Sequence, residues 1–144
     1  MAYQETLNRE RGVDTAAGGP IMRRGPAFEA FWPLYLGFIA APILAGLDKY
    51  LNLLTDWGQY ASPAFAAVFG GNVSAMMHTV GIIEVIAGLI VAWRPRVGGM
   101  IVAVWLAGII LNLLLIPGFY DIALRDFGLM LGAISLSRLS TDHV

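Results

Sequence analysis

The sequence predicts an all-α, polytopic membrane protein built as an up-down bundle of four transmembrane helices, and three observations support this fold class. First, 58% of the 144 residues are hydrophobic and 13% are charged, with a mean hydropathy of +0.69, well outside the averages for soluble domains. Second, four segments come close to the roughly 20 apolar residues that cross a bilayer, at about 31–53, 73–93, 97–116 and 122–138. Third, each segment carries a stripe of small residues, which suits closely packed helices with polar groups inside.

The segment before the first span, residues 1–27, is mostly polar and includes Gly18-Gly19-Pro20. We expect a mobile cytoplasmic tail here. The segment has no apolar core of the kind found in a signal peptide, so the first span is expected to stay in the membrane rather than to be a cleaved leader. The membrane domain is then predicted at 28–139, followed by a short cytoplasmic tail at 140–144.

The first span has small residues at every fourth position and ends in a cation: Gly37, Ala41, Ala45 and Lys49. This spacing places them on one helix face, where small side chains let another helix approach closely. The cation stands beside Asp48, so two opposite charges end this helix. We expect Pro42 to bend the helix, because its ring removes one backbone donor.

The loop that follows, residues 50–72, mixes large apolar side chains with polar ones. That mixture predicts one or two short interfacial helices, broken at Pro63 and at Gly70-Gly71. We interpret its aromatic residues as an interfacial belt, with the edge of a quinone site as the alternative; these residues are Trp57, Tyr60 and Phe65. Asn72 is expected to cap the next helix.

The second span carries a carboxylate, Glu84, in the middle of an apolar run. Gly81, Glu84 and Gly88 follow i, i+3 and i+7 spacing, so the acid shares a stripe with two small residues. An ionisable side chain at this depth is costly and usually faces protein or a wet cavity. Glu84 is therefore the first candidate functional residue, and His78 in the first turns of the same helix is the second.

The third and fourth spans begin after a basic turn, Arg94-Pro95-Arg96, and after residues 117–120. In the third span, Gly108 and Asn112 stand four residues apart. In the fourth, one stripe holds Arg125, Gly128, Gly132 and Ser135. Asp121 can pair with Arg125 at i, i+4 spacing. Asp126 is expected on a different helix face.

The distribution of basic residues predicts that both termini are cytoplasmic. Most arginines fall on one side of a four-span chain: Arg9, Arg11, Arg23, Arg24, Arg94, Arg96 and Arg138. With that orientation, polar residues from all four spans lie in the outer half of the bundle: Asp48, Lys49, His78, Asn112, Asp121, Arg125 and Asp126. We predict an outward-opening polar pocket with Glu84 at its floor. Its charges serve either a proton-linked or anion-binding function, or a structural network that fixes helix register.

Composition also excludes several classes of function. The net charge of −1 argues against nucleic acid as a partner, because such binding needs a concentrated basic face. The absence of Cys removes disulfides, thiolate metal sites, iron–sulfur clusters and thiol redox chemistry. His78 is the one histidine within the predicted bundle, and a transition-metal site normally needs about three or four ligands. We predict no metal site.

Four short motifs resemble the DoxX-like family of four-helix bacterial membrane proteins. They are Gly46-Leu47-Asp48-Lys49, Gly81-Ile82-Ile83-Glu84-Val85, Arg94-Pro95-Arg96 and Leu124-Arg125-Asp126-Phe127. The resemblance covers residues 31–139 and implies a multi-pass protein of the bacterial inner membrane. One branch of that family is a quinone-reducing oxidoreductase subunit, and another is a membrane partner of detoxifying enzymes. The long polar N-terminal segment and the extended loop 50–72 depart from a typical member.

Three hypotheses for function follow. The first is a small inner-membrane accessory or interaction subunit without a cofactor, in contact with lipid and with other membrane subunits or a second copy of itself. The second, drawn from the resemblance, is an oxidoreductase component that handles a lipid quinone, with Glu84 or His78 exchanging protons and with Lys49 and Arg125 attracting an anionic substrate. The third is a carrier for a small solute or for protons, which the absence of an inverted repeat disfavours.

Overall fold

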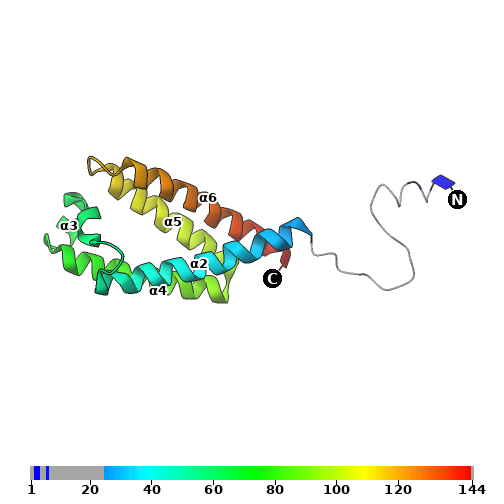
Figure 1. Cartoon of the computed structure of the whole chain (residues 1–144), viewed down its shortest axis with the longest axis horizontal. Coiled ribbons are helices and arrows are strands. Elements are labelled where there is room, and N and C mark those ends of the chain that lie inside the picture. The colour runs from blue at the N-terminus through cyan, green and yellow to red at the C-terminus, as the bar shows by residue number, and fades with distance from the viewer. Residues whose placement is uncertain (1, 4–5, 7–24, 144) are drawn as a thin grey trace.

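The computed structural model describes residues 2–3, 6 and 25–143, and within this part the chain forms helices, turns and loops without a β-strand (Figure 1). This confirms the all-α prediction. The predicted tail at 1–27 lies almost entirely outside the described residues. The predicted tail at 140–144 differs from the structure, because residues 140–143 continue the last helix.

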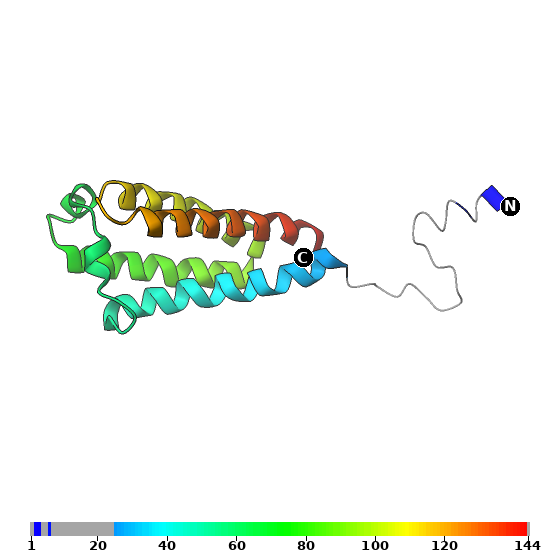
Figure 2. The same ribbon diagram turned by 45° about the horizontal axis from the view of Figure 1, so that its top comes forward.

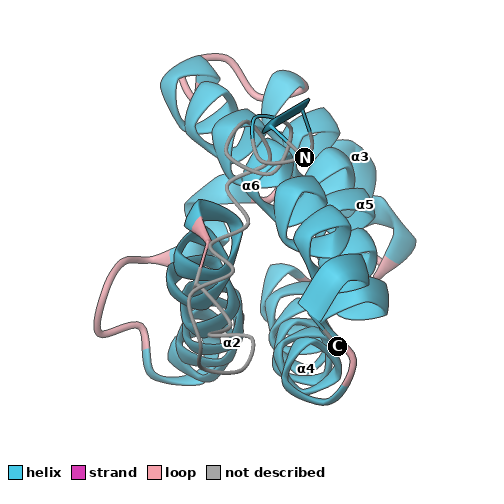
Figure 3. Ribbon diagram, turned by 90° about the vertical axis from the view of Figure 1, so that its right-hand side faces the viewer, coloured by secondary structure: helices cyan, strands magenta, loops and turns pink. Residues whose placement is uncertain are grey.

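Four long helices make up the bundle: α2 (Pro26–Leu51), α4 (Val73–Trp93), α5 (Pro95–Leu114) and α6 (Tyr120–His143). They alternate in direction along the chain (Figure 2). The most extensive contacts are between α2 and α4 and between α5 and α6, and further contacts join α4 to α5 and α2 to α6. Seen along its length, the bundle has these four helices side by side (Figure 3).

Three of the long helices, α2, α4 and α5, are long and apolar enough to cross a membrane. They suggest a membrane protein in contact with the lipid bilayer. The fourth, α6, is long enough but does not meet the same test for apolar composition. Charged residues interrupt its apolar sequence: Asp121, Arg125, Asp126, Arg138 and Asp142.

The connection between α2 and α4 contains two short helices, η1 (Trp57–Tyr60) and α3 (Pro63–Val68). The Ser62 hydroxyl accepts from the Phe65 N–H and caps α3. Gly70 and Gly71 end the segment with φ of +66° and +79°, which non-glycine residues rarely adopt. The sequence predicted these breaks and also the N-cap of α4, where the Asn72 side chain accepts from the Ala75 N–H at 3.0 Å.

The long first helix, α2, is continuous through Pro33 and Pro42, so the bend expected at Pro42 does not interrupt it. It ends at Asn52, whose φ of +51° is left-handed and whose N–H returns to the Asp48 carbonyl at 2.6 Å. Asparagine tolerates this conformation better than most residues. The chain therefore turns sharply away from the bundle axis just after Asp48 and Lys49.

The tightest approach between α2 and α4 is at Gly46 and Gly81. A Cβ atom added to Gly46 would lie 2.5 Å from the Gly81 carbonyl oxygen, and one added to Gly81 would lie 2.6 Å from the Gly46 carbonyl oxygen. The two backbones are thus in direct contact. A Cβ atom added to Gly46 would also lie 3.2 Å from the Glu84 Cβ, and one added to Gly81 would lie 3.3 Å from the Lys49 Cβ. The same crossing therefore brings the two charged side chains together.

We expect Gly46→Ala to lower the free energy of unfolding by about 1–3 kcal/mol, because the new methyl group meets backbone that cannot move aside. Gly37→Ala is the matched control on the same helix, since nothing lies within 4 Å of its added Cβ. The control should keep or raise stability by about 0.5–1 kcal/mol. Reversible unfolding in detergent, followed by circular dichroism, measures both. Equal effects of the two substitutions would contradict the close crossing.

Candidate functional site

The central feature of the site is a buried ion pair between α2 and α4. The Lys49 Nζ lies 2.6 Å from the Glu84 Oε2, and the two side chains are 4% and 11% exposed. Charges in such surroundings attract strongly, and each needs the other because an unpaired buried charge is very costly. The pair confirms that Glu84 has a partner within the chain.

Aromatic rings complete the surroundings of this pair. The Lys49 Nζ is 3.8 Å from the centroid of the Trp57 ring, which is contributed by η1. A cation over an indole face gains further stabilisation. The Trp105 indole of α5 interacts favourably with the Glu84 carboxylate, but its buried Nε1 makes no hydrogen bond of good geometry.

A second carboxylate, Asp126 of α6, is also buried and acts on the same pair. Its charge attracts Lys49 and repels Glu84. Its oxygen Oδ1 lies 3.1 Å from the Arg125 guanidinium, whose side chain is 64% exposed. We call Lys49, Glu84, Trp105 and Asp126 the buried polar cluster. Each of the four long helices contributes one of its members, and Arg125 stands at its rim.

Asp48 has a different role from the one the sequence predicted. Its carboxylate accepts from the Leu53 N–H at 2.9 Å, from the Leu54 N–H at 3.0 Å and from the Trp57 Nε1 at 2.8 Å. Three donors hold it to the chain that follows α2. Asp48 thus fixes the start of the loop and positions Trp57 over Lys49, rather than lining an open pocket.

Asn112 also serves the loop. Its side chain accepts from the Ser62 N–H at 2.9 Å and donates to the Tyr60 carbonyl at 2.6 Å. These two bonds attach the segment between η1 and α3 to the end of α5. Asn112 is buried as predicted, but it acts as a tether for backbone groups that would otherwise lack partners.

Two other predicted residues lie apart from the buried polar cluster. The His78 ring stacks on Tyr50, with centroids 4.4 Å apart and an interplanar angle of 6°, and the Tyr50 hydroxyl donates to the His78 carbonyl. Asp121 is exposed. The pairing expected between Asp121 and Arg125 is replaced by the bond between Arg125 and its neighbour Asp126.

The predicted outward-opening pocket is closed at its floor. Glu84 is 8% and Lys49 is 5% exposed, because Trp57 covers the lysine and the Asp48 and Asn112 bonds hold the loop in place. Access to Glu84 from this end would need the loop to move. Among the residues that the structure describes, no three His, Cys, Asp or Glu side chains gather to hold a metal ion.

The sequence did not single out Trp57 and Trp105 as members of the site. Trp57 was interpreted as part of an interfacial belt, and Trp105 was not given a role. The tryptophans themselves were a signal for the site, because a buried cation favours an aromatic face and a buried carboxylate favours an indole N–H. Spacing alone does not place either ring beside its charge, because the loop conformation and the α5 rotation decide both.

Comparison of the chain with protein-family models, curated proteins and solved structures gives no match.

We expect Lys49→Met alone to destabilise the fold by about 3–5 kcal/mol, because it strands Glu84 in the bundle interior. The double variant Lys49→Met with Glu84→Leu should recover most of that loss, since well-packed apolar residues replace a buried ion pair at little cost. Unfolding in detergent measures the original chain, both single variants and the double variant. A double variant no more stable than Lys49→Met would show that the two residues do not act as a pair.

Proposed function

We propose that this chain is a small accessory or interaction subunit of a larger, respiratory or redox, complex in the bacterial inner membrane. In this proposal all four long helices span the membrane, η1 and α3 lie at its outer surface, and both termini are cytoplasmic. The occupant of the bundle's outer face is then another membrane subunit or a second copy of the chain.

The observation that carries the proposal is the outward face of α6. Arg125, Gly128 and Ser135 are exposed, whereas Gly132 of the same stripe packs against Phe38 of α2. Nothing lies within 4 Å of a Cβ atom added at Gly128. An arginine facing hydrocarbon is costly, whereas exposed glycine lets a neighbouring helix approach closely. A protein neighbour suits this face better than lipid does.

The buried polar cluster supports the same proposal. Lys49 and Glu84 bind each other at 2.6 Å, and Asp48 has three donors from its own chain. Charged side chains whose ion-pair and hydrogen-bond partners lie within the same chain fix the register of helices and loops. This structural role needs no substrate, and it fits a subunit that packs against other membrane proteins.

The charge distribution supports the orientation. Arg94 and Arg96 join α4 to α5, and Arg138 lies near the end of α6, at the end of the bundle where α2 begins (Figure 1). Lys49 and Arg125 lie toward the other end. Basic residues concentrate on the cytoplasmic side of membrane proteins, so this end is assigned to the cytoplasm.

A second candidate function is a quinone-linked oxidoreductase component, as the resemblance to the DoxX-like family implies. The observation in its favour is a second buried carboxylate beside the Lys49–Glu84 pair, namely Asp126, which is bonded to Arg125 at the rim of the buried polar cluster. Such a group of carboxylates can take up and release a proton. Glu84 would be the proton-exchanging residue, reached after movement of the loop.

The test is gentle detergent extraction of the tagged chain from its native membrane, followed by mass spectrometry of the attached proteins, lipids and quinones. We expect stoichiometric membrane subunits. Gly128→Leu should release them by blocking close approach at α6, while Gly108→Leu, which also has open space at its Cβ, should retain them. Both variants should keep the stability of the original chain.

A lone chain or homodimer that carries quinone would overturn the accessory proposal and favour the second candidate. In that case Glu84→Gln should abolish quinone-dependent activity in the purified protein while the helices stay folded. Retained activity in a folded Glu84→Gln variant would remove Glu84 from the mechanism.

A further inference from the structure

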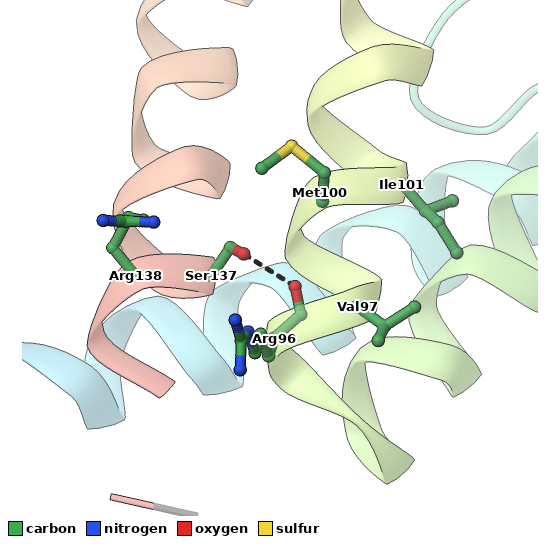
Figure 4. Close-up of a pocket in the computed structure, with 6 residues that line it drawn as sticks. All are labelled: Arg96, Val97, Met100, Ile101, Ser137 and Arg138. Carbon is green, nitrogen blue, oxygen red and sulfur yellow. Dashed lines mark hydrogen bonds between the residues drawn. The ribbon is translucent and has the colours of Figure 1, made fainter. Parts of the chain in front are cut away.

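At the end of the bundle opposite the loop, an open depression of about 390 Å³ lies between the start of α5 and the end of α6. Six residues line it: Arg96, Val97, Met100, Ile101, Ser137 and Arg138 (Figure 4). The Ser137 hydroxyl donates to the Arg96 carbonyl at 2.7 Å and joins the two walls. None of these residues belongs to the buried polar cluster.

The depression has a charged part and an apolar part. Arg96 on α5 and Arg138 on α6 are both exposed and bring two positive charges to it from different helices. Val97, Met100 and Ile101 are 47%, 45% and 39% exposed, and Met100 and Ile101 lie further along α5 than Arg96 (Figure 4). Their i, i+3 and i+4 spacing places them on one face of the helix.

The position of this depression along α5 matches the boundary of a bilayer. α5 is apolar enough to span the membrane, and Arg96 is its second residue. If α5 spans the membrane as proposed, Arg96 lies at the level of lipid headgroups, while Met100 and Ile101 lie at the level where acyl chains begin.

We propose that this depression binds an anionic phospholipid. Its phosphate would lie between Arg96 and Arg138, since guanidinium groups match phosphate in charge and in bidentate geometry. Its acyl chain would follow Val97, Met100 and Ile101. Basic pockets between membrane helices on the cytoplasmic side are suited to such headgroups. The inference rests on the proposed placement of α5 in the membrane and not on the existence of a partner subunit.

The test is native mass spectrometry of the purified full chain in neutral detergent, titrated with phosphatidylglycerol or with phosphatidylcholine. We expect preferential retention of phosphatidylglycerol. Arg96→Gln and Arg138→Gln, on separate walls, should each weaken that binding roughly fivefold. Arg94→Gln is the matched control, because it removes the same charge from an exposed neighbour that lies against Trp93 outside the depression. It should change the binding little.

Two further measurements separate a lipid from free phosphate. Met100→Trp fills the apolar part and leaves both arginines in place, so it should weaken phospholipid binding. Inorganic phosphate should compete poorly with the lipid. Equal retention of both lipids, or an equal loss in Arg94→Gln, would overturn the proposal. Full competition by inorganic phosphate, with Met100→Trp unchanged, would assign the depression to a free anion instead.

Discussion

The contact between Gly46 and Gly81 is the constraint on which the interior of this protein depends. Backbones that touch at this crossing leave α2 and α4 little freedom to slide. Because the two helices are antiparallel, Glu84 lies against Gly46 and Lys49 lies against Gly81. The two charged side chains are then close enough to form a direct ion pair at 2.6 Å. Rotation of either helix about its axis would separate two charges in apolar surroundings. The ion pair therefore resists rotation, as the glycine contact resists sliding.

The loop after α2 builds on the same pair. Asp48 holds the chain through Leu53 and Leu54 and fixes the Trp57 indole, and that ring covers the Lys49 ammonium. Asn112 of α5 holds the later part of the loop through its bonds to Tyr60 and Ser62. Asp48 thus positions the ring that covers its neighbour Lys49, and the two adjacent charges have different partners, the loop for Asp48 and Glu84 for Lys49.

Features encoded by local sequence were predictable, and features set by loop geometry were not. The helix ends near Asn72 and Gly70-Gly71 and the shared stripe of Gly81 and Glu84 follow from capping, backbone conformation and helical spacing. Depth along a helix placed Asn112 and His78 at the end of the bundle that carries the loop. It could not say toward which neighbour each side chain turns, because that depends on the path of residues 52–62 and on how helices rotate about their axes.

The last helix connects the interior of the bundle to its outer face. Asp126 is buried and acts on Lys49 and Glu84, while the preceding residue, Arg125, is exposed and bonded to it. A neighbouring acid that drew Arg125 outward would leave Lys49 as the principal cation for both buried carboxylates. Contact at the surface of α6 would then change the balance of charge inside the bundle through one pair of adjacent residues.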